Sequence, residues 1–578
     1  MNHAIPENGS GYALLIDMLK QANISLCSGV TGGGVIHFLK YLAPHAGQPH
    51  THGEGNHGPS FFSLGEYSAG FVPLGSYLAT GEIGACVATT GAATKLLACG
   101  LSDAKLHDIP AVYLVPISAP ACEGLCPLQD TSAHGSNIVA QLRAELPSGV
   151  FVLDDPATLG ERLAQAREQL AQHKPVALVL VHDALSQPAA AHRPAPRQHE
   201  HPLPPVGEFV KAFARHIEGR RVTLLAGEEL ARCTGAPELT SKLCEQLGAA
   251  AVWSINGSNG IARDNAYGYG YIGFGGNDAA TQHWQSLGEQ DVLLVLGACP
   301  DEYTVNLAPY AAGNLFVLTA LTDGYGQIDG SFQHRAGETY HQLVAPLEEV
   351  LAALVEHFVH QPPRNQRMAP APASLNQGHR DRPRPGHVDI VQLFEALDQR
   401  WPAGTLGFDD VCLSYKDRQY VTQRPNPKAR FFSLYRGSAM GNALGLAIGA
   451  KVAAPASLVV AFTGDGCFRL FAGNLSEASN LGILLFVLDN GCYGIVEQGL
   501  PVIIPDLEEP RYHTHLPSMD FCAMARACGW KSFDLAPDLD NLDHLFAQSR
   551  QEPGRSILVR IPVDAQQVVG LNPRARNL

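Results

Sequence analysis

Two polar side chains in the last third of the chain, Asp465 and Asn490, have the types and spacing to bind a metal ion together. Asp465 stands between glycines in LVVAFTGDGCF (458–468), and Asn490 ends ILLFVLDN (483–490). Both apolar runs resemble buried parallel strands, with FRLFAGNLSEASNLG (468–482) expected to form a helix between them. Because parallel strands deliver their carboxyl ends to one sheet edge, we expect both side chains to meet there. A carboxylate, an amide oxygen and a nearby backbone carbonyl suit Mg²⁺.

The glycines on either side of Asp465 indicate what such a metal would hold. Gly464 and Gly466 let the backbone approach a bound group closely. Backbone N–H groups and a helix N-terminus at this point favour an anion, and phosphate oxygens would complete the coordination shell of the metal. The pattern predicts a diphosphate held through a divalent cation. The alternative is an ordinary turn between strand and helix, in which Asp465 caps the helix.

The composition is that of an ordinary soluble globular protein and argues against several other classes. The chain has 578 residues, of which 46% are hydrophobic, and a formal net charge of −15. Such a charge argues against a nucleic-acid partner, which needs a basic face. No apolar run approaches the roughly 18 residues of a membrane span. Without a signal-peptide pattern, and with 13 scattered cysteines, the sequence predicts a cytoplasmic protein with reduced thiols.

Two proline-rich stretches divide the chain. SQPAAAHRPAPRQHEHPLPP (186–205) and HQPPRNQRMAPAPASLNQGHRDRPRPG (360–386) have the composition of extended linkers. They separate blocks at 1–187, 205–360 and 387–578, in which short apolar strands alternate with helical patterns. This alternation predicts an α/β protein with three doubly wound parallel-sheet domains.

Four stretches resemble, in the same order, motifs of the thiamine-diphosphate-dependent enzymes that include acetolactate synthase, benzaldehyde lyase and the 2-oxo-acid decarboxylases. GDG and the later DN (464–490) are similar to their diphosphate-binding motif. GEYSAGFVPLGSYLATGEIGACVATTG (65–91) resembles their glutamate-containing helix, and RGSAMGNALGLAIGAKVA (436–453) the segment before GDG. YGIVEQ (493–498) is similar to the continuation in acetolactate synthase. The resemblance covers almost the whole chain and implies a pyrimidine-binding, a central and a diphosphate-binding domain.

The resemblance assigns roles to single residues. Glu66 would form a charge-assisted hydrogen bond to N1′ of the cofactor pyrimidine and promote its imino tautomer. Met440 would hold the cofactor in its bent shape, where the alternative is a core methionine. The metal ligands would be Asp465, Asn490 and the backbone carbonyl of Cys492. The remaining contacts to thiamine diphosphate would come from Gly464, Gly466, Cys467, Tyr493, Gly494 and, in FDDVCLS (408–414), Ser414.

The sequence departs from the family pattern at several places near the expected pocket. The paired asparagines of the family are Asp489 and Asn490 here, and the second position, which ligates the metal, is kept. The family's Gly-Pro-Gly is GAA at 91–93, which changes the expected geometry of the substrate pocket. Cys412 replaces a glycine in the turn that contacts the diphosphate.

Two absences favour carbon–carbon ligation over simple decarboxylation. SGVTGGGVIHF (28–38) resembles the loop in which pyruvate decarboxylases place an acidic residue, but Gly33 occupies that position, as in acetolactate synthase. No His-His pair follows VYLVPISAP (112–120). Because a decarboxylase uses such acid–base groups to protonate its product-forming intermediate, their absence favours attack on a second carbonyl compound. Gln129 and Glu497 are further candidates for contact with the substrate.

Other histidines and cysteines receive structural interpretations. The histidines of PHTHGEGNHG (49–58) are expected to lie in a polar loop rather than to bind metal, because no second ligand pair stands at zinc-site spacing. Cys122 and Cys126 are expected to serve packing. His107 and His134 are interpreted as surface or loop histidines rather than proton carriers.

The sequence therefore predicts a thiamine-diphosphate- and Mg²⁺-dependent carboligase. It would decarboxylate a small, pyruvate-like 2-oxo acid and add the acyl-anion equivalent to a carbonyl or activated acceptor. Alternatives within the family are a simple decarboxylase and a 1,2-dicarbonyl lyase. An NAD(P)-binding oxidoreductase is disfavoured because the middle block lacks GxGxxG after a strand, and a non-catalytic binding protein because Glu66 and the metal pair are present. The resemblance implies a homodimer or homotetramer with sites between subunits. FAD in the central domain is not indicated and stays open.

Overall fold

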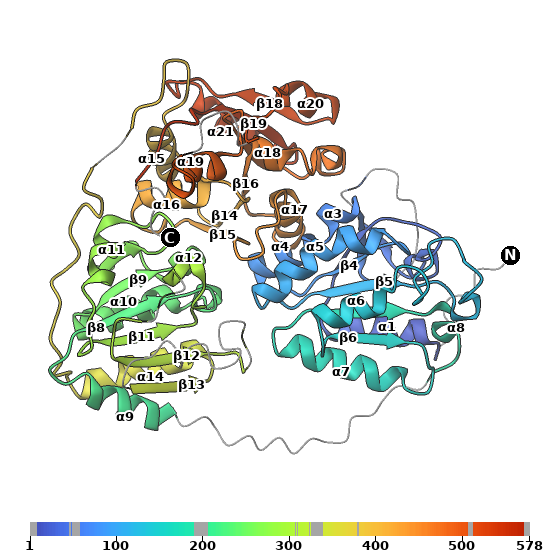
Figure 1. Ribbon diagram of the computed structural model, residues 1–578, viewed down its shortest axis with the longest axis horizontal. Coiled ribbons are helices and arrows are strands. Elements are labelled where there is room, and N and C mark those ends of the chain that lie inside the picture. Colours follow the sequence, from blue (N-terminus) through green and yellow to red (C-terminus); the bar gives the residue numbers. More distant parts are fainter. Residues whose placement is uncertain are drawn as a thin grey trace.

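The computed structural model describes residues 9–45, 48, 58–189, 206–306, 308, 310–322, 324, 339–378, 381–506 and 513–570. Within these ranges the chain forms three α/β domains, each built on one sheet whose paired strands all run parallel. The first and central domains lie side by side, and the third domain lies across both of them (Figure 1). The predicted fold class is confirmed. The strands of each sheet fall inside one of the three predicted blocks, whose bounds stay a prediction.

The first domain carries a seven-stranded sheet in the order β2-β3-β1-β4-β5-β7-β6. Its strands are β1 (Leu26–Gly29), β2 (Ala43–Pro44), β3 (Ser60–Ser63), β4 (Ala85–Val87), β5 (Val112–Pro116), β6 (Val150–Leu153) and β7 (Val176–Leu180). Its helices are α1 (Gly11–Gln21), α2 (Ile36–Leu39), α3 (Glu66–Ala69), α4 (Val72–Thr80), α5 (Ala93–Leu106), α6 (Ile138–Glu145), α7 (Leu159–Ala171) and α8 (His182–Leu185). Every residue of β5 and β7 is buried, as expected for parallel strands covered on both faces.

The central domain carries a six-stranded sheet in the order β10-β9-β8-β11-β12-β13. Its strands are β8 (Val222–Ala226), β9 (Ala250–Trp253), β10 (Gly268–Tyr271), β11 (Val292–Leu296), β12 (Asn314–Thr319) and β13 (Thr339–Val344). Its helices are α9 (Val206–His216), α10 (Ala236–Leu247), α11 (Asp278–Gln285), α12 (Glu302–Val305) and α14 (Leu347–His360). The apolar strands and one face of each long helix form a hydrophobic core of their own, around Phe213, Trp253 and Phe316.

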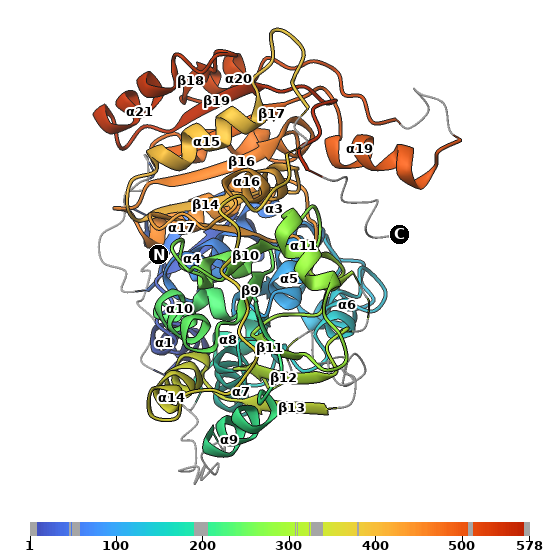
Figure 2. The same cartoon turned by 90° about the vertical axis from the view of Figure 1, so that its left-hand side faces the viewer.

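The third domain carries a six-stranded sheet in the order β15-β14-β16-β17-β19-β18. Its strands are β14 (Thr405–Asp409), β15 (Ala429–Ser433), β16 (Val459–Gly464), β17 (Ile483–Asp489), β18 (Lys531–Asp534) and β19 (Ile557–Pro562). Its helices are α15 (Ile390–Arg400), α16 (Ser414–Thr422), α17 (Ala443–Ala453), α18 (Asp465–Phe468), α19 (Gly494–Ile503), α20 (Phe521–Ala527) and α21 (Leu542–Gln551). Helix α19 projects from the body of this domain (Figure 2).

The first and third domains share one hydrophobic core through α4 and α17. The backbones of the two domains almost touch. A Cβ added to Gly445 would lie 2.2 Å from the carbonyl oxygen of Ser68, and one added to Gly449 would lie 2.0 Å from that of Val72. These two glycines are four residues apart and therefore lie on one face of α17. Only glycine permits this approach, which anchors the α3–α4 region, with Glu66 at its start, on the third domain.

The helix predicted over 468–482 does not form. The segment contains two short 3₁₀ turns, Ala472–Asn474 and Ser476–Ala478. Tertiary hydrogen bonds replace the helical ones: the Asn474 side chain donates to the Ser68 hydroxyl at 2.9 Å, and the Trp530 indole donates to the Leu475 carbonyl at 2.5 Å. Glycine, asparagine and serine in this stretch are also weak helix formers, so the tertiary contacts prevail.

The second proline-rich stretch has no helix or strand between 361 and 378, in agreement with an extended linker. It is docked rather than free. The Met368 amide donates to the Gly248 carbonyl, and the Ala371 amide to the Ala266 carbonyl, both at 2.7 Å. The linker is thus bound along the central domain. Residues 190–205 of the first stretch lie outside the described residues.

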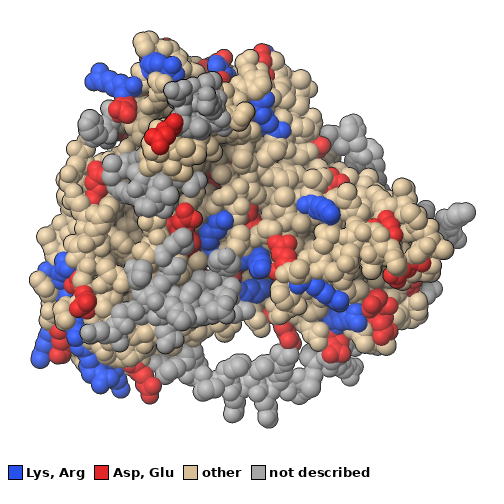
Figure 3. All heavy atoms as spheres, viewed as in Figure 1, with Lys and Arg blue, Asp and Glu red and all other residues tan. Residues whose placement is uncertain are grey.

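The surface carries both signs of charge. On the face shown in Figure 3, acidic and basic side chains occur in small mixed groups between larger uncharged areas. Among the residues that the structure describes, no helix has the length and apolar character that crossing a bilayer requires.

Candidate functional site

A pocket with a volume of about 240 Å³ opens at the carboxyl edge of the third sheet. Most of its wall comes from the turns that follow β14, β15, β16, β17 and β19 and from the start of α19, and Tyr303 of the central domain and Ile390 of α15 also line it. Every predicted cofactor residue of this domain except Ser414 lines it: Met440, Gly464, Asp465, Gly466, Cys467, Asn490, Cys492, Tyr493 and Gly494. The pocket therefore lies where parallel α/β sheets usually bind ligands, at the carboxyl ends of the strands.

Asp465 and Asn490 are brought together because β16 and β17 pair in register, with Gly464 opposite Leu488. The two Asp465 carboxylate oxygens accept the Gly466 amide at 2.9 Å and the Gly491 amide at 2.8 Å. The side-chain oxygen of Asn490 accepts the Cys492 amide at 3.0 Å. Short local hydrogen bonds thus hold the oxygen atoms of both side chains in place.

The chemistry of these donors fits a hard divalent cation. Burial raises the pKa of Asp465 to about 6, although the hydrogen bonds from Gly491 and Gly466 act in the opposite direction. A buried carboxylate of this kind is stabilised by a cation beside it. Among the described residues no group of three or more His, Cys, Asp or Glu side chains could hold a metal. A cation here would therefore rely on amide and carbonyl oxygens beside Asp465, which suits Mg²⁺ better than Zn²⁺.

Two glycines of the motif are required by close packing around the predicted ligands. A Cβ on Gly466 would lie 2.6 Å from the Tyr493 ring, and one on Gly494 would lie 2.7 Å from the Asn490 side-chain nitrogen. Any larger residue would displace Tyr493 or rotate the Asn490 amide. The glycines therefore preserve the orientation of the predicted metal site.

The predicted role of Ser414 needs correction. Its hydroxyl is fully buried and donates to the Asp409 carboxylate at 2.7 Å instead of lining the pocket. Cys412, two residues earlier, lines the pocket in its place. Burial raises the pKa of the Cys412 thiol far above its ordinary value, so this residue stays a neutral thiol. The family's glycine turn is thus occupied by a small, uncharged side chain.

The first domain reaches the pocket through Tyr67. The Tyr67 hydroxyl donates to the carbonyl oxygen of Met440, and the Gly441 amide donates to the Asp410 carboxylate at 2.8 Å. Met440 itself lines the pocket. The position of Met440 therefore depends on contacts from two domains.

The predicted glutamate of the first domain does not line the pocket of its own chain. Glu66 is half-buried at the start of α3, directly after β3. Its neighbour Tyr67 contacts the Met440 segment, but Glu66 is absent from the pocket wall. Its role as the partner of the pyrimidine ring stays a prediction.

The predicted substrate residues of the first domain gather at the carboxyl edge of the first sheet. Gly33 follows β1, and a Cβ added to it would meet no atom within 4 Å. A Cβ added to the neighbouring Gly32 would lie 2.2 Å from the Thr89 hydroxyl after β4, and one added to Gly91 would lie 2.9 Å from Cβ of Gln129. Gly33, Gly91 and Gln129 therefore belong to one edge, at which Gly33 faces open space.

The remaining substrate candidate, Glu497, is turned away. Its carboxylate accepts the Thr514 hydroxyl and does not line the pocket, whereas its neighbour Gln498 does. Sequence reasoning missed Asp564 and Gln567, which also line the pocket. Both follow β19, so applying the strand-end rule to the last strand would have found them.

His107 is not the surface histidine that the sequence predicts. It is fully buried at the C-terminal end of α5, where it contacts the central and third domains. His134 is exposed, as expected. Cys126 is also exposed, so it does not serve packing. The stretch PHTHGEGNHG lies outside the described residues apart from its last glycine.

A second buried carboxyl, Glu229, which follows Glu228 in the sequence, predicts how stability depends on pH. Burial raises the pKa of Glu229 to about 7, although hydrogen bonds from Ala320 and Thr319 act in the opposite direction. The neutral Glu229 carboxyl therefore makes its full contribution to the free energy of unfolding below the ordinary pKa of glutamate. This contribution is lost as the pH rises through about 7. The glutamine side chain of Glu229→Gln is neutral at every pH. Between pH 5 and pH 8 this variant should therefore lose about 2 kcal/mol less unfolding free energy than the wild-type protein.

Urea denaturation at both pH values measures this change. Glu238→Gln is the matched control, because Glu238 belongs to the same domain but is 74% exposed and pairs with Lys242. An unchanged pH dependence in Glu229→Gln would show that Glu229 is ionised in the folded protein throughout this range.

Family models of known proteins match two parts of the chain, one in the first domain and one in the third. A family model described as "Thiamine pyrophosphate enzyme, N-terminal TPP binding domain" matches residues 10–118. A second, described as "Thiamine pyrophosphate enzyme, C-terminal TPP binding domain", matches residues 415–560. Thiamine pyrophosphate is another name for thiamine diphosphate. The first match contains Glu66, and the second contains most of the pocket wall.

Curated relatives and solved structures match most or nearly all of the chain. An acetolactate synthase from Mycobacterium avium is 25% identical over 98% of this chain and 89% of its own length. The acetolactate synthase isozyme 2 large subunit of Escherichia coli K12 is 25% identical over 80% of this chain and 81% of its own. Benzoylformate decarboxylase from Polynucleobacter necessarius superimposes with a TM-score of 0.75 at 17% identity, covering 97% of this chain and 99% of that one.

Proposed function

Because the chain belongs to the thiamine-diphosphate-dependent enzymes, we propose that it is a Mg²⁺-dependent carboligase. It decarboxylates a small, pyruvate-like 2-oxo acid and transfers the acyl unit to a carbonyl or activated acceptor. The observation that carries this proposal is the open space at Gly33, where an added Cβ would meet no atom within 4 Å. The acetolactate synthases among its relatives support the same reaction type.

The third domain would hold the cofactor through the metal. Asp465, Asn490 and the Cys492 carbonyl would ligate Mg²⁺, and the ion would bind the diphosphate. The oxygen donors at this sheet edge and the close-packed glycines support this assignment. When bound, thiamine diphosphate supplies the carbanion chemistry of the reaction. The protein supplies the orientation and the metal.

Glu66 would act on the pyrimidine half of the cofactor. Its carboxylate would hydrogen-bond to N1′ and hold a proton there, in a charge-assisted bond of the strong kind. Within one chain Glu66 lies outside the pocket wall, so we propose that a second copy of the chain supplies it. The enzyme would then be a homodimer or a homotetramer, with each site between two subunits.

Exposed apolar side chains at the pocket and in the first domain support such an assembly. Tyr493 is 36% exposed and Val496 is 43% exposed at the start of α19, and Leu470 is 52% exposed after α18. Leu128, next to Gln129 in the first domain, is 92% exposed. Burying these side chains against a second chain would remove apolar surface from water.

The absence of an acid at position 33 decides between ligation and decarboxylation in this proposal. An enzyme that releases an aldehyde must deliver a proton to the reacting carbon, and the glycine-rich loop 28–38 contains no carboxylic acid. The open space at Gly33 would instead admit the acceptor. FAD binding in the central domain stays open.

Introducing an acid at position 33 should change the products. With pyruvate and an aldehyde acceptor, the wild-type enzyme should form coupled product and little free acetaldehyde. Gly33→Asp should raise the acetaldehyde share about tenfold or more, because a positioned acid accelerates proton transfer and also fills the space for the acceptor. Mass analysis of products from pyruvate with aldehydes, ketones and activated alkenes measures the shares.

The matched control is Gly207→Asp on α9, another glycine whose added side chain would meet no atom within 4 Å. It should leave the product ratio unchanged. Rapid release of acetaldehyde by the wild-type enzyme, independent of any acceptor, would make the protein a decarboxylase.

A further inference from the structure

The segment that carries Met440 is held by side chains from both other domains. This segment, residues 433–440, connects β15 to α17. Asn256 of the central domain accepts the Ser433 amide at 2.9 Å and donates to the Ser433 carbonyl, also at 2.9 Å. Tyr435 donates its hydroxyl to the Asp301 carboxylate at 2.7 Å. The start of the segment is therefore bound to the central domain.

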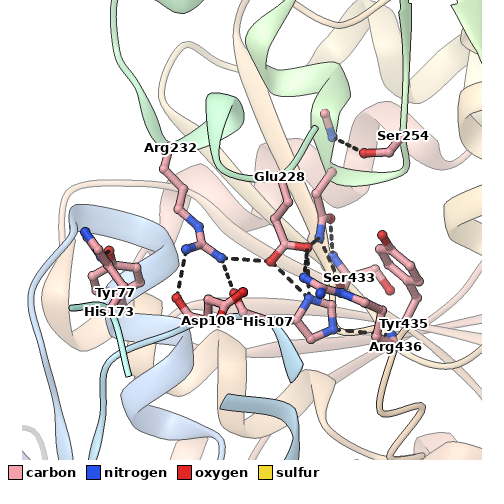
Figure 4. Close-up of polar contacts among 12 residues, drawn as sticks. Tyr77, His107, Asp108, His173, Glu228, Arg232, Ser254, Ser433, Tyr435 and Arg436 are labelled. Carbon is pink, nitrogen blue, oxygen red and sulfur yellow. Dashed lines mark hydrogen bonds and ion pairs between the residues drawn. The ribbon is translucent and has the colours of Figure 1, made fainter. Parts of the chain in front are cut away.

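Three charged or polar side chains, one from each domain, meet at the middle of the segment (Figure 4). His107 of the first domain contacts the Glu228 carboxylate of the central domain, with Nδ1 at 2.9 Å from Oε2. Arg436 of the third domain lies with one guanidinium nitrogen 3.2 Å from the same oxygen. The backbone amide of Arg436 donates to Nε2 of His107 at 3.3 Å.

The hydrogen bonds define the protonation state of His107. Because Nε2 accepts the Arg436 amide, it carries no proton, so Nδ1 carries the ring proton and donates to Glu228. Burial lowers the pKa of His107 and so favours the neutral ring, although the attraction of Glu228 acts in the opposite direction. Burial alone would raise the pKa of Glu228, but His107, Arg436 and Arg232 hold it well below its ordinary value. The junction thus joins a neutral histidine, a carboxylate and a guanidinium.

The far end of the segment has little freedom. A Cβ added to Gly437 would lie 1.8 Å from an Asp103 carboxyl oxygen, and Asp103 is fully buried. The Met440 carbonyl accepts the Tyr67 hydroxyl. Because Gly437 has little room beside Asp103, a displacement at Arg436 would pass along the backbone to residues 438–440 and would act against the Tyr67 hydrogen bond that also holds Met440.

We infer that His107 is a positioning residue, which acts through the backbone amide of Arg436 to hold residues 436–440, and thereby Met440, at the wall of the cofactor pocket. Glu228 orients the His107 ring by accepting its proton. The inference rests on the proposed function in one respect, that Met440 contacts the bound cofactor. It gives the first domain a second link to the Met440 segment, besides the hydrogen bond from Tyr67.

Two substitutions of His107 separate its two hydrogen bonds. The amide of Asn occupies the place of Nδ1, so His107→Asn keeps a donor for Glu228 and loses the acceptor for Arg436. The amide oxygen of Gln reaches the place of Nε2, so His107→Gln keeps the acceptor. If His107 only held the domains together, both variants would behave alike, since each retains one bond of similar strength.

Hydrogen–deuterium exchange of the cofactor-free protein tests the first step. Peptides covering 435–441 should lose protection about tenfold in His107→Asn, and should keep nearly wild-type protection in His107→Gln. Peptides covering α17 (Ala443–Ala453) serve as the internal control for global unfolding and should be unchanged in both. Equal exchange of 435–441 in wild type and His107→Asn would overturn the inference.

Cofactor affinity tests the second step. Calorimetry with thiamine diphosphate and Mg²⁺ should show about tenfold weaker binding in His107→Asn and near wild-type binding in His107→Gln. In a Met440→Ala background, His107→Asn should add little further loss, because its effect acts through Met440. A loss of the same size in both backgrounds would contradict this route.

A nearby histidine provides the matched control. His173 of the first domain accepts or donates a hydrogen bond with Tyr77 at 2.9 Å and has a φ of 59°, which asparagine tolerates well. His173→Asn should change neither exchange nor affinity. Failure of the wild-type protein itself to bind thiamine diphosphate would reject the proposed function, whereas normal wild-type binding with no difference between the Asn and Gln variants would reject only the role of His107.

Discussion

Replacing Asp465 by Ala is expected to abolish the retention of thiamine diphosphate. Asp465 is 3% exposed and is the carboxylate of the predicted metal site. Loss of an outer partner of a metal ligand typically weakens binding 10- to 100-fold, so loss of the ligand itself should cost more than about a hundredfold. Asn490→Ala should have a similar effect, because it removes the amide oxygen that we propose as a ligand of the same cation. Calorimetry with the cofactor and Mg²⁺ measures both.

Two further variants make this result specific. Asp465→Asn keeps an oxygen that can accept the Gly466 or Gly491 amide, so it preserves the turn while removing the charge. Asp489→Asn removes the neighbouring carboxylate, which pairs with Arg560 at 2.7 Å and does not line the pocket. The first should still lose the cofactor and the second should retain it. Unchanged affinity in Asp465→Ala would overturn the metal assignment.

Mixing two inactive variants should restore activity. Glu66→Gln and Asp465→Ala affect different halves of the cofactor, and we propose that these halves are bound by different subunits. In a heterodimer of the two chains, one site carries both substitutions and the other carries neither. Each homodimer should be slowed by about 10²- to 10⁴-fold or more. A heterodimer should regain about half of the wild-type activity if its two sites act independently.

The basis of this expectation is the position of Glu66. It lies on α3 at the carboxyl edge of the first sheet, whereas Asp465 lies in the pocket at the edge of the third, and Glu66 is absent from that pocket wall. The experiment needs conditions that exchange subunits, with exchange confirmed by mass spectrometry of differently tagged chains. Confirmed exchange without recovered activity would mean that each site is built within one chain or that the two sites are strictly coupled.

Much of the fold and the position of the proposed diphosphate site could be predicted from local sequence patterns. A short apolar run followed by glycine and a polar residue is determined by neighbours a few positions apart, so the sequence alone places Asp465 and Asn490 at strand ends. The order of the sheet then brings them together, because β16 and β17 are adjacent. Gly466 and Gly494 follow the same logic, since their nearest contacts, Tyr493 and Asn490, belong to the same stretch after β17.

The sequence could not show which of two neighbouring polar side chains faces the pocket, because both have similar surroundings in the sequence. Ser414 and Cys412 stand two residues apart in one turn, and only the packing of the third domain turns Ser414 toward Asp409 and leaves Cys412 on the pocket. The predicted helix over 468–482 likewise yields to hydrogen bonds with Ser68 and Trp530, which belong to distant parts of the chain.

The sequence by itself determined the α/β class, the strand ends that bear Asp465 and Asn490 and the similarity to thiamine-diphosphate enzymes, because these depend on contiguous residues. Only the tertiary structure decided the surroundings of His107. Its partner Glu228 is 121 residues away and its partner Arg436 is 329 residues away. From the sequence, a single histidine after a helix resembles a surface residue. Its burial between three domains and its hydrogen bond to a distant carboxylate leave no pattern in the neighbouring residues.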